Sequence, residues 1–175
     1  MAEIKVPFHK AAITKEEEDA VLDVLRSGWL TTGKYALEFE KKFSDYMNKD
    51  SFCHKARIQA GLSTEPVISL AVNSNTSGMI LAMEACGVKK GCAVITTPYT
   101  FVSTAACAKH LGAEVFFADI EKDSYNIDVE NIKKILESPE GKKVRAIVPV
   151  HIAGNPCNMK EICALAKKYG IYVIA

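Results

Sequence analysis

The chain has 175 residues, of which 49% are apolar and 25% are charged, and its formal net charge is +1. This length and composition are ordinary for a globular domain with a substantial core. A charge balance so close to zero favours neither nucleic acid nor a membrane surface as a partner. No run approaches the roughly 18 apolar residues of a membrane helix, and the N-terminus has no apolar signal core. We therefore expect a cytoplasmic protein.

The six cysteines include no C-x-x-C pair, and the four histidines are scattered along the sequence. Several of the cysteines fall beside alanine and leucine within helical patterns, where free thiols are commonly buried. This distribution favours structural thiols in a reducing compartment over disulfides. It also gives no reason to expect a metal site.

Residues 1–50 are expected to form an N-terminal helical segment. Thr14 followed by Glu17 is a capping-box pattern, and it predicts a helix that Gly28 ends. A second helix is predicted over residues 35–47. The loop between them holds Trp29, the only tryptophan, and is either a hydrophobic anchor for the first helix or a lip that faces a substrate. Residues 51–66 show no regular pattern, and we interpret them as an irregular insertion.

Residues 67–175 alternate between short apolar runs and helical patterns. Strands are predicted at 67–72, 93–96, 114–118, 144–150 and 171–175, and helices at 77–86, 102–111, 129–137 and 159–168. Strands that alternate with helices at this spacing are typical of βαβ units. The sequence therefore predicts an α/β fold with a mostly parallel sheet and helices on both faces.

A small polar loop follows the first predicted strand and opens the next helix. Ligands in open parallel sheets bind beyond the carboxyl ends of the strands, and a helix N-terminus offers free N–H groups and a positive dipole end. The hydroxyls of Thr76 and Ser77 would add donors, so the loop suits a phosphate. The alternative is that these hydroxyls only cap the helix. The glycine fingerprints of dinucleotide and P-loop sites are absent.

Two more residues follow predicted strands on the same side of the sheet. Phe101 comes after residues 93–96, where its ring could stack on a planar ligand, or it could pack with Tyr99 at the start of a helix. His151 comes after residues 144–150, and it is either a site residue or a structural histidine.

The chain resembles the DegT/DnrJ/EryC1/StrS family of sugar aminotransferases, which are fold type I enzymes that use pyridoxal 5′-phosphate (PLP). The matching segments run in order along most of the chain: SGWLTTG (27–33), VNSNTSGM (72–79), GCAVITTPYTFVST (91–104), LGA (111–113), YNID (125–128) and VPVHIAGNP (148–156). The resemblance implies that residues 67–175 are an incomplete PLP-binding large domain. The nearest likeness is to enzymes that aminate C4 of UDP-linked 4-keto sugars.

The resemblance also implies roles for individual residues. Thr76 and Ser77 would bind the PLP phosphate, and Phe101 would stack on the pyridine ring. Asn75 would belong to the phosphate turn, where the family usually has a smaller residue. The residues expected to border the sugar-nucleotide site are Trp29, Leu30, Thr31 and Thr32.

The implied reaction transfers an amino group from glutamate to a keto sugar carried on a nucleotide diphosphate, in a homodimer. The family's pyridine-nitrogen aspartate and Schiff-base lysine have no match within residues 1–175, so no catalytic residue is assigned. We expect this N-terminal half to be inactive alone. The alternatives are a non-catalytic binding or interaction module that keeps the phosphate half-site, or an unrelated doubly wound nucleotide-binding domain.

Overall fold

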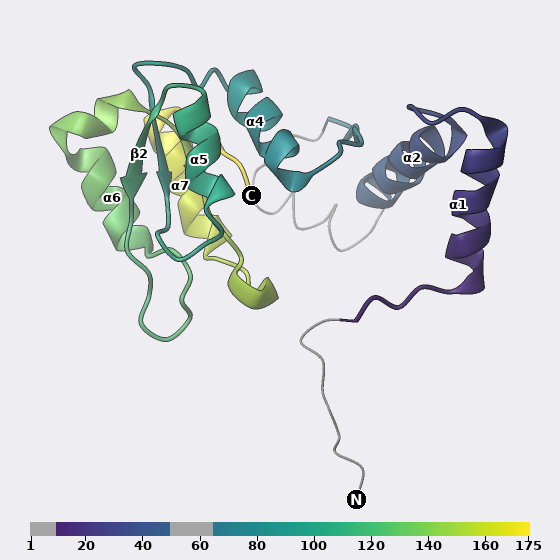
Figure 1. Ribbon diagram of the computed structural model, residues 1–175. Coiled ribbons are helices and arrows are strands. Elements are labelled where there is room, and N and C mark those ends of the chain that lie inside the picture. The colour runs from purple at the N-terminus through teal and green to yellow at the C-terminus, as the bar shows by residue number, and fades with distance from the viewer. Residues whose placement is uncertain (1–9, 50–64) are drawn as a thin grey trace, which may run out of the picture. The chain divides into compact units, whose positions relative to one another are not determined.

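The computed structural model describes residues 10–49 and 65–175 (Figure 1). The chain divides into two compact units, one made of residues 1–51 and 66–71 and the other of residues 52–65 and 72–175. Most of the expected insertion, residues 51–64, lies outside the described residues. In the part that is described, no helix is long and apolar enough to cross a membrane.

The first unit contains helices α1 (Lys15–Ser27) and α2 (Lys34–Asn48). The expected capping box is present, because the Thr14 side chain accepts from the Glu17 backbone N–H and the Glu17 carboxylate accepts from the Thr14 backbone N–H. Gly28 ends α1 with a φ of 70°, a left-handed angle that glycine adopts without strain. The prediction of two helices in this segment is confirmed.

The predicted strand at 67–72 is wrong, because this segment is extended but pairs with none of the strands in the described residues. Alternate backbone N–H groups donate instead to side chains one turn apart on α2: Val67 to Asn48 (2.7 Å), Ser69 to Ser44 (2.9 Å) and Ala71 to Glu40 (2.8 Å). Two extended residues rise about 6.6 Å and four helical residues about 6 Å, so the two spacings match. The backbone N–H groups that would pair with a neighbouring strand are therefore bonded to side chains of α2.

The second unit is built on four parallel strands in the order β2-β1-β3-β4. They are β1 (Ala93–Thr96), β2 (Glu114–Phe117), β3 (Val144–Val148) and β4 (Tyr172–Val173). Strand β2 is one residue shorter than predicted, and β3 and β4 are shorter by two and three residues. All four residues of β1 are buried, as expected for a central parallel strand that is covered on both faces.

Helices cover both faces of this sheet (Figure 1). Helices α4 (Asn75–Ala85) and α5 (Ser103–His110) contribute to one buried cluster, which includes Met83, Val94 and Cys107. Helices α6 (Val129–Glu137) and α7 (Met159–Tyr169) contribute to the other, which includes Ile95, Ile132 and Ile162. Short 3-10 turns lie at η1 (Pro139–Lys143) and η2 (Ile152–Gly154). The predicted α/β class, with helices on both faces, is confirmed.

One irregularity interrupts the pairing of β1 with β3. Ala93 pairs with Val144 and Val94 with Ala146, so Arg145 is an extra residue in β3. Such a bulge reverses the face to which later side chains point. The Arg145 side chain leaves the sheet and its Nε donates to the Cys86 carbonyl at 3.0 Å.

Candidate functional site

A pocket of about 430 Å³ lies in the second unit, past the carboxyl ends of β1 and β3. The residues that line it are Asn75, Thr76, Met79, Thr100, Phe101, Ser103, Thr104, Val148, Pro149, Val150, His151, Ile174 and Ala175. The volume is within the usual range of small-molecule sites. Three of the four residues expected to bind cofactor line this one hollow, together with His151.

The N-terminus of α4 forms one wall of the pocket. Ser74 caps the helix, because its Oγ accepts from the Ser77 N–H at 3.1 Å. Asn75 is the first helical residue and does not have a positive φ, so the turn does not need a left-handed angle at this position. Thr76 follows it in the wall. Ser77 does not line the pocket, and its hydroxyl is 3.0 Å from the Ser74 hydroxyl.

Phe101 is 75% exposed at the pocket. This exposure argues against the interpretation that its ring packs at the start of α5. Tyr99 makes a different contact, since its ring centroid lies 5.7 Å from that of Tyr125. Phe101 therefore offers a free aromatic face beside the helix N-terminus.

His151 follows β3, and a short hydrogen-bonded loop fixes its ring. Its Nδ1 accepts from the Cys157 N–H at 3.1 Å. The Cys157 thiol donates to the Val150 carbonyl at 3.2 Å, and burial raises the pKa of this thiol. Because Nδ1 is an acceptor, the neutral ring carries its proton on Nε2.

Sequence reasoning missed Asn126 as a residue that supports this site. Asn126 is only 3% exposed, and its side chain bonds the backbone of the loop that follows His151. Its amide nitrogen donates to the carbonyls of Asn155 and Pro156, both at 3.1 Å, and its Oδ1 accepts from the Ile152 N–H at 3.2 Å. Asn126 lies in the segment 125–128 that resembles the family, but the resemblance gave it no role, and nothing in its local sequence indicated that its amide reaches this loop.

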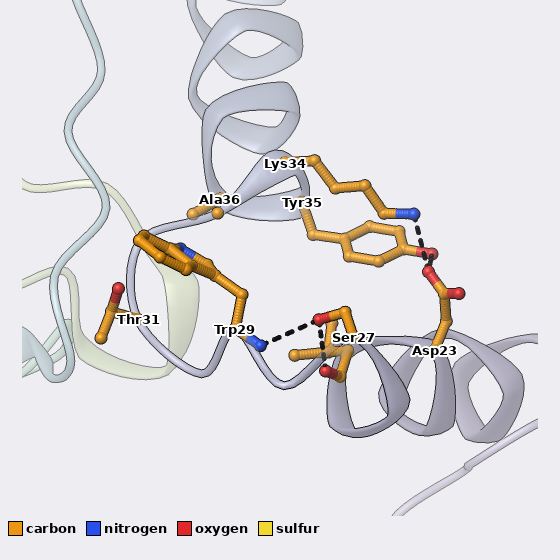
Figure 2. A pocket seen from close by; sticks show the side chains of 9 residues that line it. Asp23, Ser27, Trp29, Thr31, Lys34, Tyr35 and Ala36 are labelled. Atoms are coloured by element: carbon orange, nitrogen blue, oxygen red, sulfur yellow. Dashed lines mark hydrogen bonds and ion pairs between the residues drawn. The ribbon is translucent and has the colours of Figure 1, made fainter.

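A second hollow of about 440 Å³ lies in the first unit, between the end of α1 and the start of α2. Trp29 and Thr31 line it, whereas Leu30 and Thr32 do not. Figure 2 shows the side chains of Lys34 and Tyr35 directed at the Asp23 carboxylate. The distances are 2.7 Å from Lys34 Nζ and 2.9 Å from the Tyr35 hydroxyl.

These contacts shift the pKa of the Asp23 carboxyl in one direction and those of its two partners in the other. The Lys34 hydrogen bond, followed by that of Tyr35, lowers the pKa of the Asp23 carboxyl. The same carboxylate raises the pKa of Lys34 and the pKa of Tyr35. The indole Nε1 of Trp29 donates to the Thr32 carbonyl at 2.9 Å, which fixes the ring at the edge of the hollow.

The pocket of the second unit suits an aromatic ring that carries an anionic group. A helix N-terminus and hydroxyls attract anions, and Phe101 offers a surface for stacking. Among the described residues that line it, none is a lysine or a carboxylate. The described ranges, 10–49 and 65–175, also contain no cluster of three or more residues that could hold a metal ion.

Comparison with known sequences gives a family match over nearly the whole chain. The profile of the DegT/DnrJ/EryC1/StrS aminotransferase family matches residues 11–57 and 58–175. The spore coat polysaccharide biosynthesis protein SpsC of Bacillus subtilis is 36% identical over 169 residues, and so is an uncharacterized protein of Methanocaldococcus jannaschii. Each match covers 97% of this chain but 38% of the relative, so the chain spans well under half of their length.

Solved structures of aminotransferases are also similar to this chain, and the chain again covers well under half of their length. An aminotransferase from Psychrobacter cryohalolentis is similar with a TM-score of 0.77 and 30% identity, over 95% of this chain and 38% of that one. The PLP-form of a putative sugar aminotransferase from Streptococcus pneumoniae has a TM-score of 0.78 and 25% identity, over 98% of this chain and 39% of that one. The same pneumococcal protein is also known in a PMP-form.

Proposed function

The chain belongs to the DegT/DnrJ/EryC1/StrS aminotransferase family, and on that premise we propose that its second unit supplies the phosphate- and ring-binding part of a PLP site. The family is PLP-dependent. The observation that carries the proposal is that the α4 N-terminus and the exposed ring of Phe101 line the same pocket of about 430 Å³. Both features suit a phosphorylated aromatic cofactor.

The residues present fit this cofactor. Thr76 would donate its hydroxyl to the phosphate while the first-turn N–H groups of α4 face the same anion. Ser77 would contribute through its position in that turn, and Asn75 would border it. Phe101 would hold the pyridine ring by stacking. When bound, PLP supplies the carbonyl and the electron-withdrawing ring that amino transfer requires.

For the whole enzyme we propose amino transfer from glutamate to a nucleotide-linked keto sugar. The names of two relatives support this class, since one is a putative sugar aminotransferase and the other a spore coat polysaccharide biosynthesis protein. The loop that contains Trp29, Leu30, Thr31 and Thr32 would border the sugar nucleotide. We further propose a cytoplasmic homodimer in which such sugars are prepared for cell-surface polysaccharide.

We propose that these 175 residues alone bind the cofactor without catalysing transfer. No described residue that lines the pocket is a lysine, and covalent attachment of PLP requires a lysine amine. This feature also supports the second candidate function, a binding module that performs no chemistry. Addition of a C-terminal chain that supplies the aspartate and the lysine separates the candidates, because only the aminotransferase would then consume glutamate in a transamination assay.

The first prediction concerns pyridoxamine 5′-phosphate (PMP), which has no aldehyde and therefore does not label surface lysines. We expect calorimetry to show saturable binding to the 175-residue chain. Loss of the hydroxyl in Thr76→Ala removes a bond to an anion and should weaken binding about tenfold. Loss of the ring in Phe101→Ala should weaken it about fivefold.

Two control variants remove the same chemical groups away from the pocket. Ser138→Ala deletes a hydroxyl that bonds the Ile135 carbonyl, and Phe39→Ala deletes a ring that stacks on Phe43. Neither should change the affinity for PMP. No binding by the wild-type chain, or equal losses in the control and pocket variants, would contradict the assignment of this pocket.

A further inference from the structure

We propose that Asn126 is a positioning residue that holds His151 as a neutral hydrogen-bond donor in the pocket of the second unit. His151 would donate through Nε2–H to an oxygen of the bound cofactor. The role as a cofactor ligand rests on the proposed function, whereas the positioning rests on the contacts of these two residues alone.

One ring nitrogen of His151, Nδ1, already accepts a hydrogen bond within the protein. Its Nδ1 accepts from the Cys157 N–H at 3.1 Å, and the ring lines the pocket. A backbone N–H can only donate, so this contact requires that Nδ1 carry no proton. The neutral ring must then present N–H at Nε2, the nitrogen that is free to meet a ligand.

Asn126 fixes the loop that supplies this backbone donor. Two carbonyls and one N–H of residues 152–156 are bonded to its side-chain amide, at 3.1, 3.1 and 3.2 Å. The loop includes Ala153 and Gly154, both with positive φ, so it needs external bonds to keep its form. Asn126 is itself held, since its N–H donates to Ser124 Oγ at 3.1 Å and its carbonyl accepts from the Glu121 N–H at 2.8 Å.

Only a carboxamide satisfies all three bonds. Its nitrogen provides two donors for two carbonyls, and its oxygen accepts from one N–H. An aspartate has the same shape, but it would place carboxylate oxygens against two carbonyl oxygens. A substitution of Asn126 by aspartate should therefore release the loop and with it the Cys157 N–H that orients His151.

The test has a spectroscopic part that needs no ligand. In ¹⁵N NMR spectra at about pH 8, where an ordinary imidazole is neutral, His151 should show a single tautomer with a bare Nδ1 and a protonated Nε2. His110 lies in the last turn of α5 and serves as the internal comparison, while His151→Gln identifies the signal. In Asn126→Asp the His151 signals should move to those of a mixed tautomer.

The second part is a double-mutant cycle on PMP affinity. His151→Leu loses the donor and should bind PMP about fivefold more weakly, as for the loss of one neutral hydrogen bond, while His151→Gln keeps a donor and should recover most of that loss. Asn126→Asp should weaken binding by about the same factor in the wild-type chain. It should have no further effect in the His151→Leu chain.

The NMR spectra test how His151 is oriented, and the PMP affinities test whether His151 contacts the cofactor. A protonated Nδ1 in the wild-type chain overturns the positioning, and this result needs neither a variant nor PMP. An Asn126→Asp effect that is equal in both backgrounds, or no rescue by His151→Gln, also overturns the inference. A tautomer that is fixed in the wild-type chain and mixed in Asn126→Asp, in a chain that does not bind PMP, confirms the positioning and refutes the proposed function instead.

Discussion

Ala153 is strained at a position beside the candidate site. Its φ is 50° and its ψ 27°, a left-handed conformation that costs a residue with a Cβ atom about 1–2 kcal/mol. Glycine adopts these angles freely but loses more backbone entropy on folding. We therefore expect Ala153→Gly to raise the free energy of unfolding by about 0.5–1 kcal/mol, measured by urea denaturation with circular dichroism.

Ala164→Gly is the matched control for this prediction. Ala164 is exposed within α7, where the same substitution should lower the free energy of unfolding by about 1 kcal/mol. Opposite signs for the two variants would confirm that the backbone angle decides the effect. A loss of stability in both would contradict the left-handed assignment of Ala153.

Some residues at the pocket of the second unit could be predicted from the sequence, and others could not. Phe101 was predictable because it follows β1, a strand that forms as expected, and the ligand side of a parallel sheet is known from its topology. Thr76 was predictable from its place at a helix N-terminus, since the strand expected before it is not part of the sheet. Asn126 was not predictable, because its partners lie 26 to 30 positions further along the chain. Nothing in a single sequence indicates which backbone groups a buried amide will satisfy.

The ends of the helices could be predicted well, because capping residues and glycines act on the backbone next to them. Thr14 caps α1 as expected and Asp128 caps α6, and Gly28 and Gly170 end α1 and α7 in left-handed conformations. Strands were less predictable, because a strand is defined by its partner and not by its own residues. Residues 67–72 have the composition of a strand, but in this structure their backbone donors bind side chains of α2.

The α1–α2 connection should respond to acid through Asp23. Lys34 and Tyr35 hold the pKa of this carboxyl below its usual value of 3.8. A lowered pKa in the folded state means that the contact stabilises the connection above the unfolded value, and that this contribution is lost as the pH falls through the folded value. We expect the fluorescence of Trp29, the only tryptophan, to stay constant above pH 3.8 and to change as the pH falls below this value.

Asp23→Asn should abolish this acid response, because the amide does not titrate. Glu38→Gln is the control, since Lys42 likewise lowers the pKa of Glu38 but neither residue lines the hollow beside Trp29. It should leave the response of the fluorescence unchanged. An unaltered acid response in Asp23→Asn would refute the assignment. Both carboxylates are exposed, so added salt should weaken the effect.

At the scale of the second unit, one sheet separates two buried clusters. Cys107 lies in the cluster under α4 and α5, and it is 1% exposed. Cys157 lies in the cluster under α6 and α7, and it is 4% exposed. Burial raises the pKa of both thiols, which lowers their reactivity because the thiolate is the nucleophile.

These two cysteines can therefore report whether the two faces of the sheet unfold together. Strands β1 and β3 contribute residues to both clusters, so neither cluster can open while the sheet keeps its packing. We expect alkylation of Cys107 and of Cys157, followed by mass spectrometry across a urea series, to give the same midpoint. Cys92 is only partly buried and should react in native buffer as the control. A lower midpoint for Cys157 would show instead that the loop after β3 opens independently of the sheet, and the hydrogen bonds of Asn126 would then be too weak to fix His151.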